Sequence, residues 1–148
     1  MKKILMVCLG NICRSPLAQG ILETKVDANE VFVDSAGTGA YHIGKLPDSR
    51  SISVAKKHGI DITNQRARQF QVEDFDEFDV IFVMDQSNYQ NIICLARTVE
   101  DEGKVKMILN EISPEDNSVP DPYYGGDRGF DNVFKMLDEA CSIVASKL

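Results

Sequence analysis

Apolar and polar residues alternate along the chain in two distinct patterns. Short runs rich in β-branched or aromatic residues, bounded by turn formers, are typical of buried strands. Four such runs occupy residues 2–8, 29–37, 78–84 and 103–109. The segments between and after them carry apolar residues at the three- and four-residue spacing of helices. Strands that alternate with helices predict right-handed βαβ units, and therefore a parallel sheet covered on both faces.

The helical segments differ in how clearly their ends are marked. Residues 48–58 start with Asp48, a good N-cap, and Gly59 follows as a typical C-terminal stop. Another helix is expected directly after Ser15-Pro16, and the last helix carries the clearest apolar stripe. The expected apolar faces are Leu17, Ala18, Ile21 and Leu22; Tyr89, Ile92, Ile93 and Ala96; and Phe130, Val133, Phe134, Leu137, Cys141 and Val144.

Length and composition fit a single globular domain. The chain has 148 residues, of which 43% are hydrophobic and 26% charged, and this apolar content is enough for a buried core. No repeat or low-complexity linker divides it, and residues 38–47 and 110–126 are the two irregular stretches. We therefore expect one α/β domain over residues 1–148. The formal net charge of −7 argues against a broad nucleic-acid surface, so an anionic ligand would need a local site.

The amino-terminal apolar run is too short for an export signal or a membrane span. Lys2 and Lys3 precede six apolar residues, whereas a secretory signal needs roughly 7–15 and a membrane span roughly 20. We expect no membrane partner and a cytoplasmic location, where the four cysteines stay reduced. There is no Cys-x-x-Cys, and only His42 and His58 could complete a zinc site, so we expect neither a metal nor another cofactor.

A cysteine and an arginine bracket the loop that follows the first predicted strand. Cys8 and Arg14 enclose the residues Leu9, Gly10, Asn11, Ile12 and Cys13. Loops at the carboxyl ends of parallel strands are where α/β sheets bind ligands. Gly10 and Asn11 tolerate the backbone conformations that turn successive N–H groups inward. The loop is therefore predicted to hold an anion.

A helix is expected to begin directly after this loop. Ser15 would be its N-cap and Pro16 its first residue, where the missing N–H costs nothing. The helix would then point its free N–H groups and the positive end of its dipole into the loop. This setting favours a bound dianion and the thiolate form of Cys8, while Arg14 offers a planar fork for two phosphoryl oxygens. The combination predicts attack of sulfur on phosphorus.

Two simpler interpretations compete with this one. Cys8 alone could be a buried thiol at the end of a strand. A Walker-type phosphate loop would also follow a strand, but its Gly-Lys-Ser/Thr is absent and it gives the cysteine no role. Neither interpretation accounts for Arg14 and the Ser15-Pro16 pair in register with the cysteine.

Four segments together resemble the low-molecular-weight protein tyrosine phosphatases. VCLGNICRSPLA, residues 7–18, looks like the active-site signature of that family, and DPYYGG, residues 121–126, like its general-acid loop. VMDQSN, residues 83–88, and DSAGTGAYHIGKLPDSR, residues 34–50, also match its pattern. The resemblance covers essentially the whole chain in the right order. It implies a single three-layer α/β domain in which helices flank a four-stranded parallel sheet, with a phosphate-binding loop after strand one.

The resemblance also implies a cysteine-dependent protein-tyrosine-phosphatase. Cys8 would attack phosphorus and form a phosphocysteine, while Arg14 and the N–H groups of residues 9–15 hold the oxygens. Asp121 would protonate the leaving phenolate and then activate the water that releases phosphate. Without the resemblance, an ordinary Asp-Pro turn would explain this aspartate as well. Tyrosine-phosphorylated proteins or peptides and small aryl phosphates would be the substrates, and inorganic phosphate and other oxyanions the inhibitors.

Several polar residues are expected to support the loop. Ser15 could donate a hydrogen bond to the sulfur of the nucleophile. Family similarity implies that Ser35 and His58 clamp Asn11, although His58 fits equally well as a residue paired with a helix dipole. Asp85 would support the site from the end of the third strand, or it would cap the helix that follows.

The other cysteines are expected to have different roles. Cys13 lies in the same tight loop as Cys8, and in the family the matching pair forms a reversible disulfide that protects the nucleophile. Cys94 and Cys141 lie on predicted helices and are expected in the core.

Aromatic residues are expected to form walls for the substrate ring. The family places one in the segment that holds Tyr41, and Tyr123 and Tyr124 would form the facing wall. Ile12 resembles the tyrosine-specific branch, whereas protein arginine phosphatases of the same fold tend to carry threonine there. A protein arginine phosphatase is therefore the nearest alternative.

Two other functions share the fold or the loop. The related arsenate reductase needs two further cysteines after the third strand, where this chain has only Cys94. A non-catalytic phosphate-binding module could lack the nucleophile or the acid, and here Cys8 and Asp121 are both present. Both functions are retained as less favoured alternatives to the phosphatase.

Overall fold

Four parallel strands form one sheet in the order β2-β1-β3-β4. The computed structural model describes residues 1–112, 118–124 and 126–148, without the side chains of residues 124, 126 and 127. The strands are β1 (Lys2–Cys8), β2 (Val31–Gly37), β3 (Val80–Val83) and β4 (Val105–Met107). The α-helices are α1 (Arg14–Glu23), α2 (Ser49–Lys57), α3 (Asp74–Glu77), α4 (Gln86–Ile93), α5 (Val99–Lys104) and α6 (Gly126–Ser146). Two 3₁₀ helices are η1 (Ile108–Glu111) and η2 (Pro122–Tyr124).

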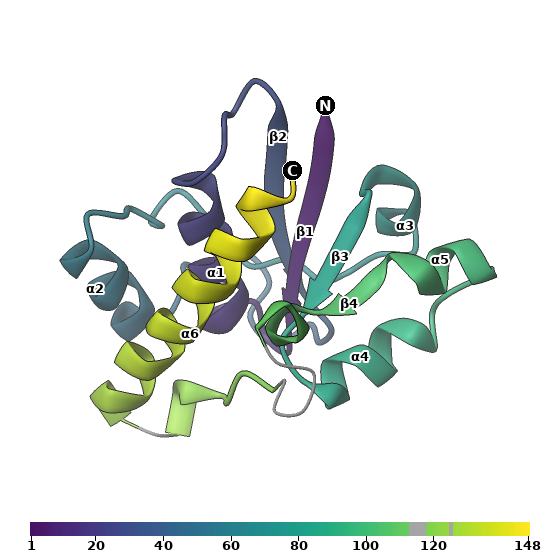
Figure 1. Cartoon of the computed structure of the whole chain (residues 1–148). Coiled ribbons are helices and arrows are strands. Elements are labelled where there is room, and N and C mark those ends of the chain that lie inside the picture. Colours follow the sequence, from purple (N-terminus) through teal and green to yellow (C-terminus); the bar gives the residue numbers. More distant parts are fainter. Residues whose placement is uncertain (113–117, 125) are drawn as a thin grey trace.

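The central strand β1 sends alternate side chains to opposite faces of the sheet, as the pleat requires. Ile4 and Met6 join the core formed with α1 and α6, whereas Leu5 and Val7 join the core formed with α3 and α4. Figure 1 shows α1, α2 and α6 on one side of the sheet and α3, α4 and α5 on the other. The predicted three-layer fold with a four-stranded parallel sheet is confirmed.

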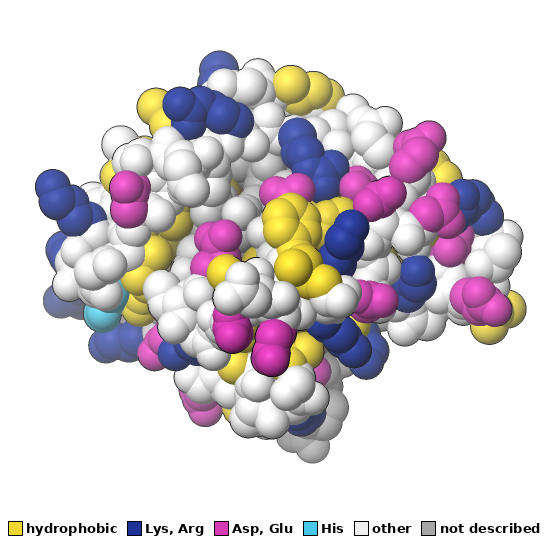
Figure 2. All heavy atoms as spheres, turned by 90° about the horizontal axis from the view of Figure 1, so that it is seen from above, with side chains coloured by type: hydrophobic (Ala, Val, Ile, Leu, Met, Phe, Trp, Pro, Cys, Tyr) yellow, Lys and Arg dark blue, Asp and Glu magenta, His cyan; other side chains and the backbone are white. Residues whose placement is uncertain are grey.

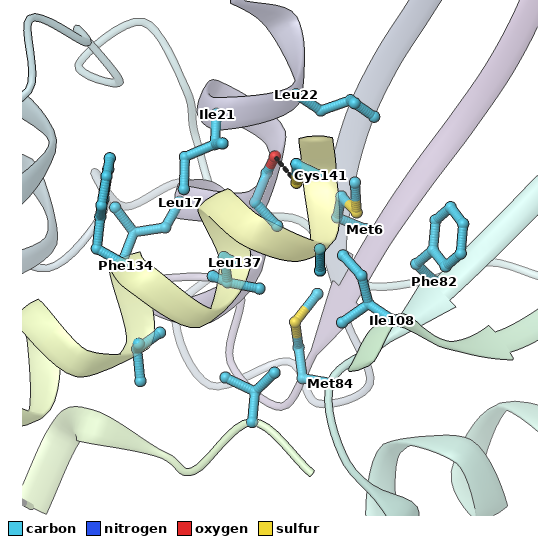
Figure 3. Close-up of a cluster of buried hydrophobic side chains, with 14 of the residues drawn as sticks. Met6, Leu17, Ile21, Leu22, Phe82, Met84, Ile108, Phe134, Leu137 and Cys141 are labelled. Atoms are coloured by element: carbon cyan, nitrogen blue, oxygen red, sulfur yellow. Dashed lines mark hydrogen bonds between the residues drawn. The ribbon is translucent and has the colours of Figure 1, made fainter. Parts of the chain in front are cut away.

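The larger core lies between the sheet, α1 and α6. Leu17 and Ile21 of α1 pack there with Phe134, Leu137 and Cys141 of α6 (Figure 3). All six apolar positions predicted for the last helix are buried, so its stripe is the surface that covers α1 and the sheet. This packing orients α1, and with it the loop at its amino end.

Cys94 departs from the prediction that it lies in the core. It is exposed, whereas Cys141 is buried as expected. The reason is the length of α4, which ends at Ile93 and leaves Cys94 as its C-cap. Only Asn88 and Ile92 of that helix are buried, and Ile93 and Ala96 on either side of Cys94 are the residues that pack against the core.

Figure 2 views the molecule from above and shows the end opposite the carboxyl ends of the strands. Lysine and arginine side chains are interspersed there with aspartate and glutamate, around a small apolar patch. In the described part of the chain, no helix is long and apolar enough to cross a membrane.

Candidate active site

The β1–α1 loop, residues 9–13, is held through its carbonyl oxygens. Four donors from the segment after β2 and from the start of α2 bond to carbonyls of Cys8 and the loop. They are Thr38 N (to Cys8 O, 2.9 Å), Gly39 N (to Leu9 O, 2.9 Å), Asp48 N (to Ile12 O, 2.8 Å) and Ser51 Oγ (to Cys13 O, 3.3 Å). The N–H groups of residues 10–14, by contrast, have no acceptor among the described residues. Successive free N–H groups of this kind form an anion-binding concavity.

Asn11 makes the sharpest turn of the loop. Its φ is +57°, in the left-handed region that asparagine tolerates better than most residues. Its amide nitrogen donates to Ser15 Oγ at 2.8 Å and to Ser35 Oγ at 3.0 Å. Its amide oxygen accepts from the backbone N–H of Arg68 at 3.0 Å. Side-chain bonds to α1, to β2 and to the segment before α3 therefore hold this backbone conformation.

His58 does not reach Asn11, so the prediction that it clamps that residue is wrong. It is the exposed C-cap of α2, and its ring stacks on Phe134 with 3.9 Å between centroids. The amino end of α2 is the end that bonds to the loop, and a helix of nine residues extends about 13 Å. The alternative interpretation, a residue at a helix end, describes its position.

The end of β2 lies against the loop so closely that only glycine fits there. A Cβ at Gly37 would lie 2.7 Å from the carbonyl oxygen of Leu9 and 3.1 Å from the nitrogen of Asn11. Real Cβ atoms do not approach backbone atoms at the shorter distance. The backbone of β2 therefore forms the outer wall of the loop.

Ser15 is bonded to the sulfur of Cys8 and is not the N-cap of α1, which corrects the prediction. The helix starts at Arg14 with Cys13 as N-cap, so Ser15 and Pro16 are its second and third residues. The hydroxyl of Ser15 lies 3.0 Å from Cys8 Sγ and is fully buried. Pro16 has no N–H, but the helix loses no hydrogen bond there, because the first four N–H groups of a helix have no partner within it.

Arg14 points into the site from the first turn of α1 and is 3% exposed. Its Nη1 donates to Asp85 Oδ2 at 2.6 Å and to the carbonyl oxygen of Val119 at 3.0 Å. Burial alone would lower the pKa of the Arg14 guanidinium, but Cys8 and the nearby carboxylates raise it above its ordinary value. Among the described residues Nε and Nη2 have no hydrogen-bond acceptor, which leaves one edge of the planar fork for a ligand.

Asp85 performs both of the roles that the sequence left open. One carboxylate oxygen accepts from the N–H of Asn88 at 2.8 Å and caps α4, and the other binds Arg14. The end of β3 therefore positions the guanidinium through one side chain.

Asp121 lies just before η2 and lines the same cavity as Cys8 and Arg14. Its Oδ2 is 3.8 Å from Arg14 Nη2, and its Oδ1 accepts from the N–H of Tyr123 at 3.0 Å. The cavity has a volume of about 380 Å³. It is lined by Cys8, Leu9, Gly10, Ile12, Cys13, Arg14, Tyr41, His42, Asp121 and Tyr123. The structure thus brings the predicted acid, which is far from Cys8 and Arg14 in sequence, into one cavity with them.

Two of the three predicted wall residues line this cavity. Tyr41 and Tyr123 are 72% and 42% exposed, so both rings are open to a ligand that enters from solvent. The side chain of Tyr124 lies outside the described residues. His42, which we did not predict, also lines the cavity, with its ring 6.5 Å from that of Tyr41.

Cys13 is buried in the loop beside the nucleophile position. Desolvation, together with the nearby Asp48, Cys8 and Asp121, raises the pKa of the Cys13 thiol to about 12. The thiol is therefore neutral in the structure as it stands. All four cysteines are free.

Some residues that support the β1–α1 loop lie in the segment 60–79, and little in the sequence indicated them. Arg68 bonds to Asn11 and makes ion pairs with Asp34 and Asp74. Gln65 is buried, and its amide nitrogen donates to the carbonyl oxygen of Pro16 at 3.0 Å. These residues lie in a stretch without helix or strand periodicity, so only the tertiary structure identifies them. His42, by contrast, is next to Tyr41 and could have been found from that position.

Metal ligands are not clustered in this structure. Within residues 1–112, 118–124 and 126–148, no group of three or more His, Cys, Asp or Glu residues is placed to hold a metal ion.

Comparison with known proteins places the chain in one family over nearly its whole length. The model of the low molecular weight phosphotyrosine protein phosphatase family matches residues 3–148. The chain is 42% identical to the low molecular weight phosphotyrosine protein phosphatase of Schizosaccharomyces pombe, over 91% of this chain and 89% of that protein. It is 36% identical to the human protein of the same name, over 99% of this chain and 95% of that protein.

Solved structures agree with the sequence comparison. A protein tyrosine phosphatase from Entamoeba histolytica, with Hepes in its active site, has a TM-score of 0.91 at 36% identity and covers 99% of this chain and 96% of its own. The tyrosine phosphatase Wzb from Escherichia coli K30, in complex with sulphate, has a TM-score of 0.88 at 31% identity, over 99% and 97%. The Wzb protein of Vibrio vulnificus, in complex with benzylphosphonate, also has a TM-score of 0.88 at 31% identity, over 99% of each chain.

Proposed function

The chain belongs to the low molecular weight phosphotyrosine protein phosphatase family, and on that premise we propose that it hydrolyses phosphotyrosine in proteins and peptides, and small aryl phosphates. The observation that carries the proposal is the cavity shared by Cys8, Arg14 and Asp121. The loop that lines it has N–H groups without an acceptor among the described residues, and Tyr41, His42 and Tyr123 also line it. A cavity of this kind suits a phosphate ester attached to an aromatic ring.

The first chemical step is attack by the sulfur of Cys8 on phosphorus. A sulfur–phosphorus bond forms, the ester bond to the phenolic oxygen breaks, and the leaving oxygen keeps the electron pair. Three phosphoryl oxygens are held by the N–H groups of residues 10–14 and by the free edge of the Arg14 guanidinium. The hydroxyl of Ser15, 3.0 Å from the sulfur, donates a hydrogen bond to the thiolate and thereby stabilises it.

Asp121 supplies the proton that the leaving oxygen needs. Its carboxyl lines the same cavity as Cys8, and its side chain is 36% exposed, so it can exchange its proton with solvent between cycles. In the second step, the same carboxylate takes a proton from a water molecule that attacks the phosphocysteine. The sulfur–phosphorus bond breaks, inorganic phosphate leaves, and the thiolate is restored.

The proposal includes the expected partners and location. Inorganic phosphate and similar oxyanions would inhibit by occupying the same N–H groups, and the sulphate complex of the E. coli relative has an oxyanion of this class. We place the activity in the cytoplasm, because the nucleophile must stay reduced. No step uses a metal, so turnover should be unchanged by a chelator.

The decisive test is to trap the intermediate on Cys8. In an Asp121→Asn protein the second step is slowed, so rapid quenching during turnover of p-nitrophenyl phosphate should show phosphate on the peptide that contains residue 8. A matched Cys13→Ser variant should retain the adduct, and Cys8→Ser should lose it. If no quench time shows phosphate on residue 8, covalent catalysis at Cys8 is wrong.

The substrate class is tested separately. Ile12 lines the cavity and is apolar, which favours contact with an aromatic ring over a guanidinium. Phosphotyrosine peptides should therefore be turned over faster than phosphoarginine peptides of the same sequence. The reverse order would support a protein arginine phosphatase.

A further inference from the structure

Arg50, in the first turn of α2, is bonded to the segment that carries Asp121. Its Nε and Nη2 donate to the two carboxylate oxygens of Asp48 at 3.0 and 3.1 Å. Its Nη1 donates to the carbonyl oxygen of Tyr123 at 3.1 Å. The guanidinium carbon also lies 5.2 Å from the centroid of the Tyr123 ring and 4.6 Å from that of Phe130. One side chain therefore joins the start of α2, η2 and the start of α6.

The same turn of α2 also holds the β1–α1 loop. The N–H of Asp48 bonds to the carbonyl of Ile12, and the hydroxyl of Ser51 bonds to that of Cys13. Arg50 lies between these two residues in sequence. The start of α2 thus contacts both the loop beside the nucleophile and the segment beside the acid.

The described part of the Asp121 segment, residues 118–124, is attached through its backbone on both sides of Asp121. Before it, Val119 donates its N–H to the carbonyl of Met84 at 2.7 Å and accepts from Arg14. After it, the carbonyl of Tyr123 accepts from Arg50, while the N–H of Tyr123 donates to Asp121 itself. Tyr123 therefore attaches the segment to Arg50 through its carbonyl and orients the Asp121 carboxylate through its N–H.

From this geometry we infer that Arg50 is a positioning residue for Asp121: it holds the Tyr123 backbone so that the carboxyl faces the leaving oxygen. The inference rests on the proposed role of Asp121 as general acid. Arg50 does not line the cavity, so it acts through Tyr123 and not by contact with the substrate.

Arginine suits this position better than lysine. A planar fork can bond to both oxygens of Asp48 and to a carbonyl at once, and it can stack on two aromatic rings. A lysine keeps the charge but offers neither geometry. The substitution Arg50→Lys should therefore restore only part of what Arg50→Ala loses.

A matched control exists on the other side of the sheet. Arg97 also makes ion pairs with carboxylates, those of Asp76 and Asp101, and lies 6.0 Å from the centroid of the Phe75 ring. It is remote from the cavity, and none of its contacts is a cavity-lining residue. Arg97→Ala removes the same kinds of contact without touching the Asp121 segment.

The experiment measures kcat/KM, which reports the steps up to release of the phenol, for aryl phosphates whose leaving groups range from p-nitrophenol to phenol, in Arg50→Ala, Arg50→Lys, Arg97→Ala and Asp121→Asn proteins. We expect Arg50→Ala to lower kcat/KM for phenyl phosphate by about tenfold and for p-nitrophenyl phosphate by about twofold or less, since only the poor leaving group needs a well-placed proton. Arg50→Lys should lie between Arg50→Ala and the unaltered chain. Inhibition by inorganic phosphate should not change, because the bonds from Asp48 N and Ser51 to the loop remain.

The outcomes separate the inference from the function on which it rests. Equal slowing for all leaving groups in Arg50→Ala, or the same profile in Arg97→Ala, would overturn the positioning role while Asp121→Asn still shows its leaving-group dependence. If Asp121→Asn itself shows no such dependence, the proposed acid is wrong. Adding Arg50→Ala to Asp121→Asn should slow phenyl phosphate turnover by less than about twofold more, since the two residues act in one step.

Discussion

The two loops that form the cavity are built in opposite ways. The polar groups at the two ends of the β1–α1 loop are buried: Cys8 and Arg14 are each 3% exposed and Ser15 is fully buried. The Asp121 segment is open, with Tyr123 42% exposed and the Asp121 side chain 36% exposed. Oxyanion stabilisation is strongest where fixed dipoles are shielded from water, because the effective dielectric constant is low there. A group that must give up and regain a proton in each cycle needs solvent access instead.

This contrast predicts two kinds of functional defect. Changes in the buried loop should affect every substrate, since every phosphoryl group uses the same donors. Changes in the exposed segment should affect substrates according to how much their leaving group needs a proton. The following experiments test whether the two regions divide the work in this way.

The largest effect is expected from Cys8→Ser. The hydroxyl is a far weaker nucleophile, so turnover should fall by about 10⁴-fold or more for every aryl phosphate. Vanadate or phosphate should still bind, because the N–H groups and Arg14 are unchanged. The measurements are steady-state turnover and isothermal titration with phosphate. Persistent turnover would exclude Cys8 as the nucleophile.

Asp121→Asn should have a smaller and more selective effect. The amide keeps the shape of the side chain but cannot give up a proton, so kcat for phenyl phosphate should fall by about 10²-fold or more. For p-nitrophenyl phosphate, the first step should slow by less than about tenfold, which a pre-steady-state burst of nitrophenol would report. A uniform loss in that burst across leaving groups would contradict the division between the two regions.

Asn11→Ala should lower the stability of the buried loop. The change removes the partner of Ser15, Ser35 and the Arg68 N–H, and it places alanine at a positive φ. The free energy of unfolding, measured with urea, should fall by about 1–3 kcal/mol. The control Asn91→Ala, an exposed residue of α4, should leave it nearly unchanged. If the free energy of unfolding falls but the affinity for phosphate does not, the loop keeps its anion-binding shape without the Asn11 side chain.

The smallest effect concerns thiol reactivity. Burial raises the pKa of both Cys13 and Cys141 to about 12, from an ordinary value of 9.0. At pH 8 both thiols stay neutral, so iodoacetamide should label exposed Cys94 about tenfold faster or more, as peptide mass spectrometry would show.

The same two thiols contribute to stability in alkali with a defined sign. Unfolded thiols ionise near pH 9, whereas the native ones stay neutral to about 12. Their contribution to the free energy of unfolding is therefore fully present below pH 9 and is lost as the pH rises towards 12. Urea unfolding at a series of pH values would measure it, with Cys141→Ala as the variant that should weaken the trend.

Much of the sheet and its covering helices followed from local patterns. The four strands appear within the predicted runs, and the stripe from Phe130 to Val144 is buried as a unit. The short helices α3 and α5 were not predicted, because a helix of four or six residues has too few turns to show a period. Cys94 was misplaced for a related reason: its spacing fitted a helix that ends one residue earlier.

Local sequence reasoning reached only those site residues that are close in sequence, whereas Asp121, Asp85 and the wall residues Tyr41 and Tyr123 came from the family resemblance. Cys8, Arg14 and Ser15 lie in one short segment between a strand and a helix, and that order alone indicates an anion-binding loop. The residues that hold this segment in shape, such as Arg68, Asp85 and Ser51, come from distant segments. His58 was placed wrongly because its position in the sequence does not show which end of α2 meets the loop.

The sequence by itself determined which elements form and which chemistry the first loop can perform, because periodicity and loop composition depend on residues within a few positions of one another. The tertiary structure alone decided the bond from Arg68 to Asn11, the bond from Arg14 to the carbonyl of Val119 and the link from Arg50 to Tyr123. Those contacts join residues far apart in the chain, and they exist only after the parallel strands and the helices that cover them have packed in register.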